Sequence, residues 1–161
     1  MNSVILLLGT NIGNRLENIN SAIDLIKKSA GKVLNKSSIY ETEPWGFSSD
    51  LAFYNIAILL ETNLSPFELI NNISIIEKTI GRERSNNTGY ENRIIDIDII
   101  SFENIVINSP ELEIPHPRMH LRKFTLLPIM EIYPDWIHPT INKNISDLLK
   151  DCNDKCIVTK I

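Results

Sequence analysis

Short apolar runs along the chain predict its strands. Residues 4–8, 54–61 and 94–102 form nearly continuous runs with the length of buried strands. Residues 33–40 form a weaker candidate, and we expect residues 105–107 to return from a turn as a short partner strand of 94–102. The last of the three long runs gives the strongest prediction because isoleucine recurs along most of its length.

Apolar residues three or four positions apart predict two long helices between these strands. The first ends at Gly31, and the second begins after the capping residue Ser65 and ends at Gly81. Residues 124–132 and 145–149 predict two shorter helices near the C-terminus.

The order of the elements predicts the fold class. Each long helix is inserted between strands, which is typical of an α+β fold with a ferredoxin-like antiparallel sheet and helices packed on it. We therefore expect a three-layer sandwich. A chain of 161 residues has the size of one domain, and we expect residues 1–161 to form it.

Composition narrows the classes of partner. The formal net charge is −4 and the pI is about 5.4, which argues against a protein that binds nucleic acid or an anionic membrane over a large surface. The apolar run at the N-terminus is too short for an export signal or a membrane span, so we expect a cytoplasmic protein. Cys152 and Cys156 are too few for a disulfide scaffold and lack further zinc ligands at a suitable spacing.

An acidic pair on the strongest strand is the sharpest chemical feature. Asp96 and Asp98 are two residues apart, so on a strand they project from the same face, while the intervening isoleucines pack on the other. Two neighbouring carboxylates repel each other unless a cation lies between them, and Mg²⁺ is the cation that prefers such oxygen ligands. The spacing alone leaves another interpretation open, in which both aspartates are simply solvated.

Arginines concentrate around this pair even though the chain is acidic. Guanidinium groups bind phosphate oxygens in pairs, and carboxylates for Mg²⁺ together with arginines for phosphate are typical of phosphoryl transfer. Surface ion pairs with nearby glutamates are the competing interpretation for each arginine. The arginines are Arg82, Arg84, Arg93, Arg118 and Arg122, with His116 and His120 among them.

A second group of residues suits a flat heteroaromatic ligand. Residues 42–46 form a loop punctuated by proline and glycine, and Asn55 interrupts an otherwise apolar strand. Phe53 and Phe124 could cover the two faces of a ring while an asparagine amide reads its edge. Core phenylalanines and a strand-end hydrogen bond would explain the same residues. No lysine follows the glycine-rich turn at residues 9–13, so an ATP-using enzyme of this sequence would not be a P-loop enzyme.

Several motifs occur together in the order and spacing of one enzyme family. The chain resembles the 6-hydroxymethyl-7,8-dihydropterin pyrophosphokinases of folate biosynthesis from about residue 4 to residue 139. The resemblance implies a ferredoxin-like, commonly monomeric enzyme that transfers the pyrophosphoryl group of ATP to the hydroxymethyl group of the pterin and releases AMP. The matching segments are residues 8–14, 38–46, 53–55, 81–84, 93–99, 114–119 and 122–124, together with Glu77.

The resemblance also assigns roles to single residues. It implies that Asp96 and Asp98 hold two Mg²⁺ ions and that Arg82 and Arg93 clamp the phosphates of ATP as catalytic residues. It implies that Phe53 and Phe124 stack on the pterin. Further ATP-binding residues would be Glu77, Arg84, Ile99 (through its backbone), His116 and Arg122. Further pterin-binding residues would be Thr42, Asn55 and the backbone from Glu43 to Trp45.

The segment before the acidic pair departs from the family pattern. The family usually has Trp-Gly-Pro-Arg, whereas this chain has Tyr90, Glu91, Asn92 and Arg93. Residues 82–93 form a long polar loop that we expect to close over ATP and exclude water.

Two other functional classes remain to be compared. A different Mg²⁺-dependent nucleotidyl or phosphoryl transferase would use the same aspartates without a pterin pocket. A ferredoxin-like binding module for RNA or a regulatory ligand would need exposed aromatic residues and a basic face on its central strands, where this chain has Asp96 and Asp98.

Overall fold

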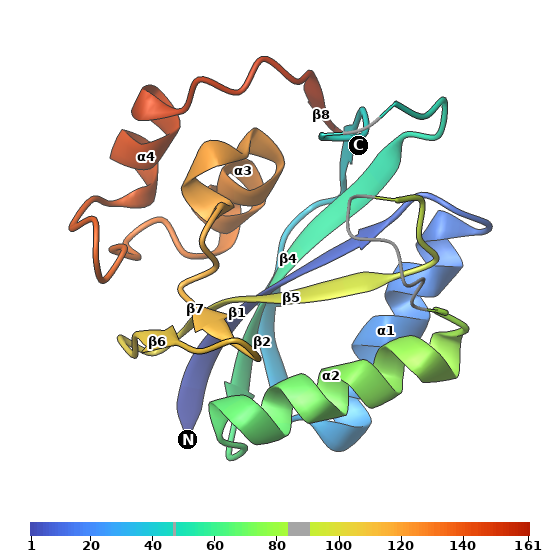
Figure 1. Ribbon diagram of the computed structural model, residues 1–161, viewed down its shortest axis with the longest axis horizontal. Coiled ribbons are helices and arrows are strands. Elements are labelled where there is room, and N and C mark those ends of the chain that lie inside the picture. Colours follow the sequence, from blue (N-terminus) through green and yellow to red (C-terminus); the bar gives the residue numbers. More distant parts are fainter. Residues whose placement is uncertain (47, 84–90) are drawn as a thin grey trace.

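The structure is a computed structural model that describes residues 1–46, 48–83 and 91–161. Strands with two long helices inserted between them occupy the first two thirds of the chain, and helices dominate the remainder (Figure 1). The strands are β1 (Asn2–Thr10), β2 (Lys32–Lys36), β3 (Tyr40–Thr42), β4 (Phe53–Thr62), β5 (Asp96–Phe102), β6 (Ile107–Asn108), β7 (Glu113–Ile114) and β8 (Val158–Lys160). The helices are α1 (Arg15–Ser29), α2 (Pro66–Ile80), α3 (Lys123–Ile132) and α4 (Ile145–Asp151), with a 3₁₀ turn at Met119–Leu121.

One antiparallel sheet forms the centre of the molecule. Its strand order is β5-β1-β4-β3-β8, and β2 pairs with a second stretch of β4. The long strand β1 therefore lies between β4 and β5 and is paired on both sides. β5, which carries the acidic pair, lies at one end of this order.

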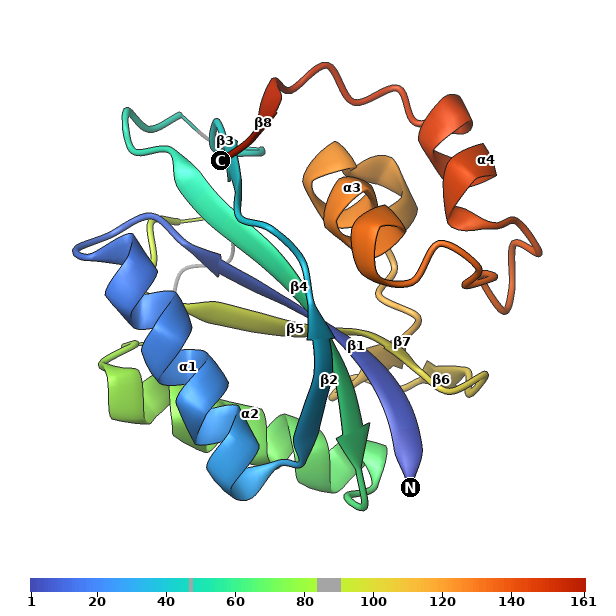
Figure 2. The same cartoon turned by 180° about the vertical axis from the view of Figure 1, so that it is seen from behind.

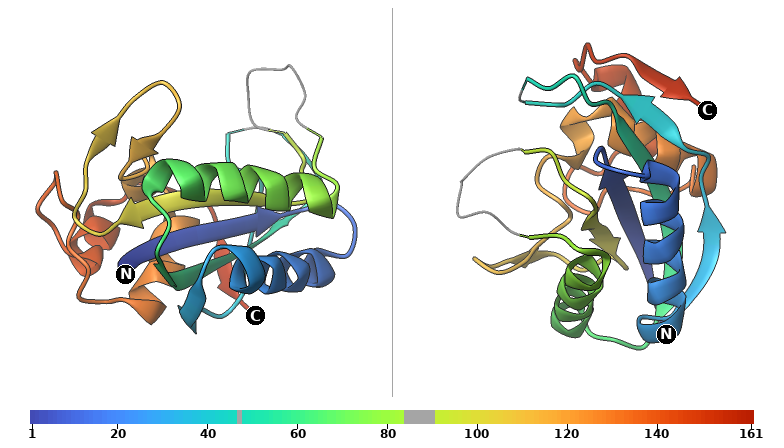
Figure 3. Two further views of the ribbon diagram at one scale, coloured as in Figure 1. Left: turned by 90° about the horizontal axis from the view of Figure 1, so that it is seen from below. Right: turned by 90° about the vertical axis from the view of Figure 1, so that its right-hand side faces the viewer.

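The sheet separates two apolar cores. On one face α1 and α2 pack against alternate residues of the central strands, such as Leu6, Ile58 and Ile97 (Figure 3). On the other face α3 and α4 pack against the residues between them, such as Ile5 and Ile100 (Figure 2). The three-layer α+β sandwich expected from the sequence is confirmed.

Local sequence signals explain where the two long helices begin and end. The side chain of Asn14 accepts a hydrogen bond from the backbone of Glu17 and caps α1. Ser65 and Glu68 form a reciprocal capping box at the start of α2. Gly81 adopts the left-handed conformation that ends α2, as predicted for a glycine in this position.

Two predictions for the smaller elements are wrong, and one short strand was not predicted. The single strand expected at residues 33–40 is two strands, β2 and β3, which pair with different stretches of β4. The expected partner of β5 at residues 105–107 instead contributes Ile107 to β6, which pairs with β7. β8 was not anticipated, because its pairing with β3 joins segments more than 110 residues apart and leaves no local signal in the sequence.

The helices do not have the length and apolar character of membrane spans in the described part of the chain. Within residues 1–46, 48–83 and 91–161, every helix is too short or too polar to span a membrane.

Candidate active site

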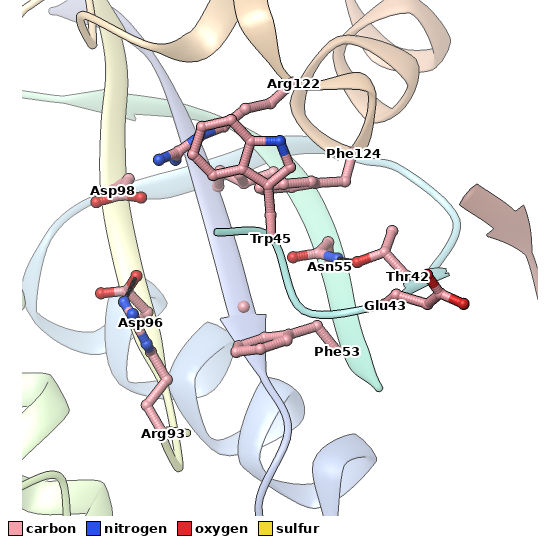
Figure 4. Close-up of a pocket in the computed structure, with 12 residues that line it drawn as sticks. Thr42, Glu43, Trp45, Phe53, Asn55, Arg93, Asp96, Asp98, Arg122 and Phe124 are labelled. Carbon is pink, nitrogen blue, oxygen red and sulfur yellow. Dashed lines mark hydrogen bonds and ion pairs between the residues drawn. The ribbon is translucent and has the colours of Figure 1, made fainter. Parts of the chain in front are cut away.

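The floor of the candidate site is one face of the central sheet. In the strand register Gly9 of β1 lies between Asp96 of β5 and Asn55 of β4. Leu7 is paired in the same way with Asp98 on one side. Because directly paired residues share a face, the acidic pair and the asparagine point into the same space (Figure 4).

This face changes its character along the strands. Under α3 it is apolar, with Ile5, Ala57 and Ile100 in the core. Beyond the start of α3 the same face carries Asn55 and the acidic pair, and these line a pocket. The sequence pattern of β5 thus produces a polar floor at the point where the helix layer ends.

The charge of Asp96 is compensated by two arginines. Nη1 of Arg82 lies 2.6 Å from Oδ1 of Asp96, and Nη1 of Arg93 forms a hydrogen bond with Oδ2. The side chains of Asp96, Arg82 and Arg93 are 21%, 16% and 13% exposed, so this cluster is largely withdrawn from water. Both carboxylate oxygens are therefore held by cations, as expected for a carboxylate that needs a positive partner.

A buried glutamate extends this cluster into α2. The carboxylate of Glu77 accepts hydrogen bonds from Nη1 of Arg82 at 2.6 Å and from the backbone N–H of Ile97 at 2.8 Å. Glu77 is only 2% exposed. In this arrangement it ties the first arginine of the predicted phosphate clamp to the helix and to β5, whereas the resemblance assigned it to the nucleoside.

Asp98 lies beside His116, and the charges of Arg122 and Arg93 also act on its carboxylate. Burial raises the pKa of the Asp98 carboxyl well above its usual range, and the charge of Asp96 acts in the same direction. Burial also lowers the pKa of His116 to about 4, helped by the charges of Arg122 and Arg118. His116 is therefore neutral near pH 7.

The position of the proton on His116 follows from its hydrogen bond. Its Nδ1 accepts the backbone N–H of Arg118 at 3.1 Å, which leaves the proton of the neutral ring on Nε2. This Nε2 lies 4.0 Å from Oδ2 of Asp98. The ring therefore presents a donor to the acidic end of the pocket.

The other half of the pocket is aromatic. Phe53 and Phe124 both line it, and the guanidinium of Arg122 lies over the rings of Trp45 and Phe124 at 4.5 Å and 5.6 Å from their centroids. Figure 4 shows Trp45 and Phe124 on the side of Arg122, with Phe53 on the side of Arg93. Such stacked groups can hold a flat ring.

A buried polar pair forms the edge of this aromatic half. The amide of Asn55 donates a hydrogen bond to the hydroxyl of Thr42 at 3.1 Å, and both residues are 3% exposed. The bond fixes the orientation of the asparagine amide, whose oxygen stays available to a ligand edge.

The structure brings together most residues that the sequence analysis singled out. Three further predicted residues are connected to the pocket by side-chain contacts. Arg82 contacts Asp96, and Glu77 contacts Arg82. His116 lies beside Asp98. The side chain of Ile99 lies in the core against the α1 and α2 layer, so only its backbone could meet a ligand. Arg84 and Tyr90 lie outside the described residues. The predicted residues that line the pocket are Thr42, Glu43, Trp45, Phe53, Asn55, Arg93, Asp96, Asp98, Arg122 and Phe124.

Sequence reasoning missed the contribution of Gly9. The glycine-rich turn at residues 9–13 lacks the lysine of a P-loop and gave no other reason to expect a ligand contact, but Gly9 lines the pocket between its acidic and aromatic halves. A Cβ atom at this position would lie 3.3 Å from Oδ1 of Asn55 and 3.9 Å from Phe53. The available signal was the glycine at the end of an apolar strand, which often marks a close approach of a ligand.

The carboxylates of Asp96 and Asp98 have the chemistry to bind a cation. Asp96 and Asp98 offer hard oxygen ligands on one strand face, which fits Mg²⁺. Within the described part of the chain, no group of three or more histidine, cysteine, aspartate or glutamate side chains is arranged to hold a metal ion. A cation on this carboxylate pair would therefore need further ligands from water or substrate phosphates.

The fold and the pocket define an α+β enzyme with a carboxylate–arginine site next to an aromatic pocket. The model of one protein family, 7,8-dihydro-6-hydroxymethylpterin-pyrophosphokinase, matches residues 5–134. The chain belongs to this family. It transfers a pyrophosphoryl group to 6-hydroxymethyl-7,8-dihydropterin in folate biosynthesis.

Relatives over most of the chain support this assignment. The 2-amino-4-hydroxy-6-hydroxymethyldihydropteridine pyrophosphokinase of Porphyromonas gingivalis is 39% identical over 138 residues, which are 84% of this chain and 93% of that protein. The enzyme of the same name from Aquifex aeolicus is 34% identical over the whole of both chains. The one from Bacillus subtilis is 40% identical over 78% of this chain and 74% of its own length.

Solved structures support the fold. The crystal structure of wild-type Plasmodium falciparum HPPK-DHPS aligns with 93% of this chain with a TM-score of 0.77 at 19% sequence identity. A structure titled HPPK-DHPS in complex with substrates aligns with a TM-score of 0.75 at 17% identity, also over 93% of this chain. The chain spans less than half of these solved chains, 44% and 43%.

The position of Gly9 generates a prediction. Gly9→Ala places a methyl group 3.3 Å from the Asn55 amide oxygen, which narrows the aromatic half of the pocket. We expect the dissociation constant of the pterin to rise by about tenfold, equivalent to roughly 1.4 kcal/mol, while that of a non-hydrolysable ATP analogue stays within about twofold. Calorimetric titration with each ligand measures both constants. An equal rise in the dissociation constants of both ligands would contradict a pterin site beside Gly9.

Proposed function

We propose that the chain performs this transfer as a Mg²⁺-dependent enzyme, with ATP bound at the carboxylate–arginine half and the pterin at the aromatic half. The observation that carries the proposal is the shared face of the sheet. Asp96 and Asn55 flank Gly9 in neighbouring strands, so ligands bound at the two halves meet above one residue. Two substrates held this close can react without further diffusion.

The reaction needs alignment and charge neutralisation. The hydroxymethyl oxygen attacks the β-phosphorus of ATP, the bond from that phosphorus to the oxygen bridging the α-phosphate breaks, and AMP leaves. The proton of the hydroxyl is lost to water. The phosphates are anionic and repel the attacking oxygen, so positive groups around them lower the barrier.

In the proposal Arg82 and Arg93 release Asp96 and turn to the phosphates of ATP. Both guanidinium groups already lie at the pocket, and each offers donors that suit phosphate oxygens. Asp96 and Asp98 would then hold two Mg²⁺ ions, as the resemblance implies. When bound, Mg²⁺ supplies charge neutralisation and polarises the oxygens that it contacts.

The neighbouring residues would orient the two substrates. Neutral His116 would donate from Nε2 to a phosphate oxygen without adding a second charge beside Asp98. The guanidinium of Arg122, which stacks on Trp45, would also donate hydrogen bonds to the phosphate oxygens. The remaining ATP-binding assignments are Arg84, Glu77 and the backbone of Ile99.

The pterin would lie between Phe53 and Phe124. Asn55, oriented by Thr42, would read the ring edge together with the backbone from Glu43 to Trp45. This arrangement leaves the hydroxymethyl group pointing toward the acidic pair on the neighbouring strand.

We also propose that the enzyme works as a cytoplasmic monomer formed by residues 1–161 as a single domain. Its partners would be small-molecule substrates only. The net charge of −4 supports this proposal because a nucleic-acid or anionic-membrane partner favours a basic surface.

The nucleotide product tests the proposed reaction. Purified protein is mixed with ATP, Mg²⁺ and 6-hydroxymethyl-7,8-dihydropterin, and AMP is quantified with and without the pterin. We expect AMP to form only when the pterin is present. ADP as the product would instead identify a γ-phosphoryl kinase, and no nucleotide turnover by folded protein would contradict the proposal.

The acidic pair gives a second prediction. We expect Asp96→Asn and Asp98→Asn each to lower kcat by more than about a hundredfold, since either change removes a charged oxygen ligand for the cation. The matched control is Asp24→Asn, which changes an exposed carboxylate on α1 and should retain wild-type turnover. Full activity in both Asp96→Asn and Asp98→Asn, measured by AMP release, would remove the metal assignment.

A further inference from the structure

A buried asparagine outside the pocket lining forms hydrogen bonds with chain segments at both halves of the site. Asn11 follows β1 two residues after Gly9 and is 3% exposed. Its side-chain amide has two N–H donors and one oxygen, and all three form hydrogen bonds. The partners belong to two separate segments of the chain, one at each half of the pocket.

One donor reaches the aromatic half. Nδ2 of Asn11 donates to the backbone carbonyl of Leu51 at 3.1 Å, two residues before Phe53. The next carbonyl, that of Ala52, accepts a hydrogen bond from Arg15 at 2.8 Å. The backbone that leads into Phe53 is therefore fixed by two consecutive side-chain donors.

The rest of the amide reaches the acidic half. Nδ2 of Asn11 also donates to Oδ1 of Asn92 at 2.7 Å, and Oδ1 of Asn11 accepts the backbone N–H of Arg93 at 2.8 Å. The backbone N–H of Asn11 donates to the carbonyl of Arg93 at 3.1 Å. These contacts fix the backbone from which the Arg93 guanidinium reaches Asp96.

We infer that Asn11 is a positioning residue that sets the aromatic wall at Phe53 relative to the phosphate clamp at Arg93. This inference rests on the proposed function. Transfer requires the attacking oxygen and the phosphorus to be held close together and in line, and a misplacement of about 1 Å can cost roughly a hundredfold in rate. Asn11 is not among the described residues that line the pocket, so it would act through the two segments that it joins.

The chemistry of the amide explains why this position needs asparagine. Aspartate would keep the acceptor for the Arg93 N–H but lose both donors, and alanine would lose all three side-chain bonds. The bond to Asn92 in turn needs a side-chain acceptor at the residue that precedes Arg93.

A purely structural role predicts a different result. Removing a satisfied, buried amide lowers the free energy of unfolding wherever it occurs, because its former partners are left unpaired. A positioning role must in addition lower the rate of the bound complex, with both substrates saturating and the protein folded. The test therefore separates three quantities: stability, the two dissociation constants and the rate of the chemical step.

The main variants are Asn11→Ala and Asn92→Ala, with Asn20→Ala on the exposed face of α1 as the matched control. Asn92→Ala removes only the bond between the two amides and lies at an exposed position, so it remains informative if Asn11→Ala does not fold. Each protein is characterised by urea unfolding and by titration with the pterin and with a non-hydrolysable ATP analogue. AMP formation is then measured in a single turnover with both substrates saturating.

For Asn11→Ala we expect the single-turnover rate to fall by about 10- to 100-fold while each dissociation constant changes by less than about threefold. The single-turnover rate of Asn92→Ala should fall by a smaller factor, and that of Asn20→Ala should equal the wild-type rate. Unchanged single-turnover rates in both Asn11→Ala and Asn92→Ala would overturn the inference, as would a loss confined to the dissociation constants.

Amide hydrogen exchange gives a readout that does not depend on turnover. In Asn11→Ala without substrates, exchange should accelerate at both residues 51–53 and residues 92–93, and not elsewhere in the sheet. Acceleration at only one segment would contradict the link. Wild-type AMP release in the same experiments reports separately on the proposed function.

Discussion

The site depends on holding two carboxylates two residues apart on a strand face that is partly withdrawn from water. Such a pair is unfavourable unless cations compensate it. Arg82 and Arg93 occupy both oxygens of Asp96, and Glu77 anchors Arg82 in turn. α2, which packs beside β5 through the apolar core, and the chain that leads into this strand supply these partners.

The same constraint explains why the cluster suits a phosphorylated substrate. With no ligand bound, the arginines serve as the counter-charges of Asp96. In the proposed reaction a nucleoside triphosphate would bring anionic oxygens that compete for the guanidinium groups, and the carboxylate of Asp96 would then be available to the cation that accompanies the nucleotide. Nucleotide and cation would therefore bind cooperatively. The nucleotide would draw the arginines away from the carboxylate that binds the cation, and the cation would neutralise the carboxylates that repel the nucleotide.

The geometry of the sheet joins this chemistry to the aromatic half. A single row of paired residues runs from Asp96 through Gly9 to Asn55. Glycine is the residue that leaves the space above β1 open, and Asn11 lies two positions further along, behind the pocket. The β1 strand is thus both the centre of the core and the element on which the two substrates would meet.

Periodicity and local chemistry predicted much of this molecule. The acidic face of β5, the helices α1 and α2 with their caps, and most of the residues that line the pocket could be identified from spacing, capping residues and the family motifs. The pairing of β3 with β8, the division of residues 33–40 and the network of Asn11 could not, because they depend on partners far away in the sequence. Glu77 shows the same limit: the resemblance implied a ligand contact for it, and its burial became visible only in the folded chain.

Binding of Mn²⁺, as a paramagnetic substitute for Mg²⁺, would show whether the acidic pair is a cation site that the nucleotide completes. Free and bound Mn²⁺ would be quantified by electron paramagnetic resonance, with and without a non-hydrolysable ATP analogue. The account predicts two bound ions per chain with the analogue, at least about tenfold weaker binding without it, and loss of this enhancement in Asp98→Asn. Equal Mn²⁺ affinity with and without the analogue, or undiminished binding in Asp98→Asn, would contradict the claim that the acidic pair is a cation site completed by the nucleotide.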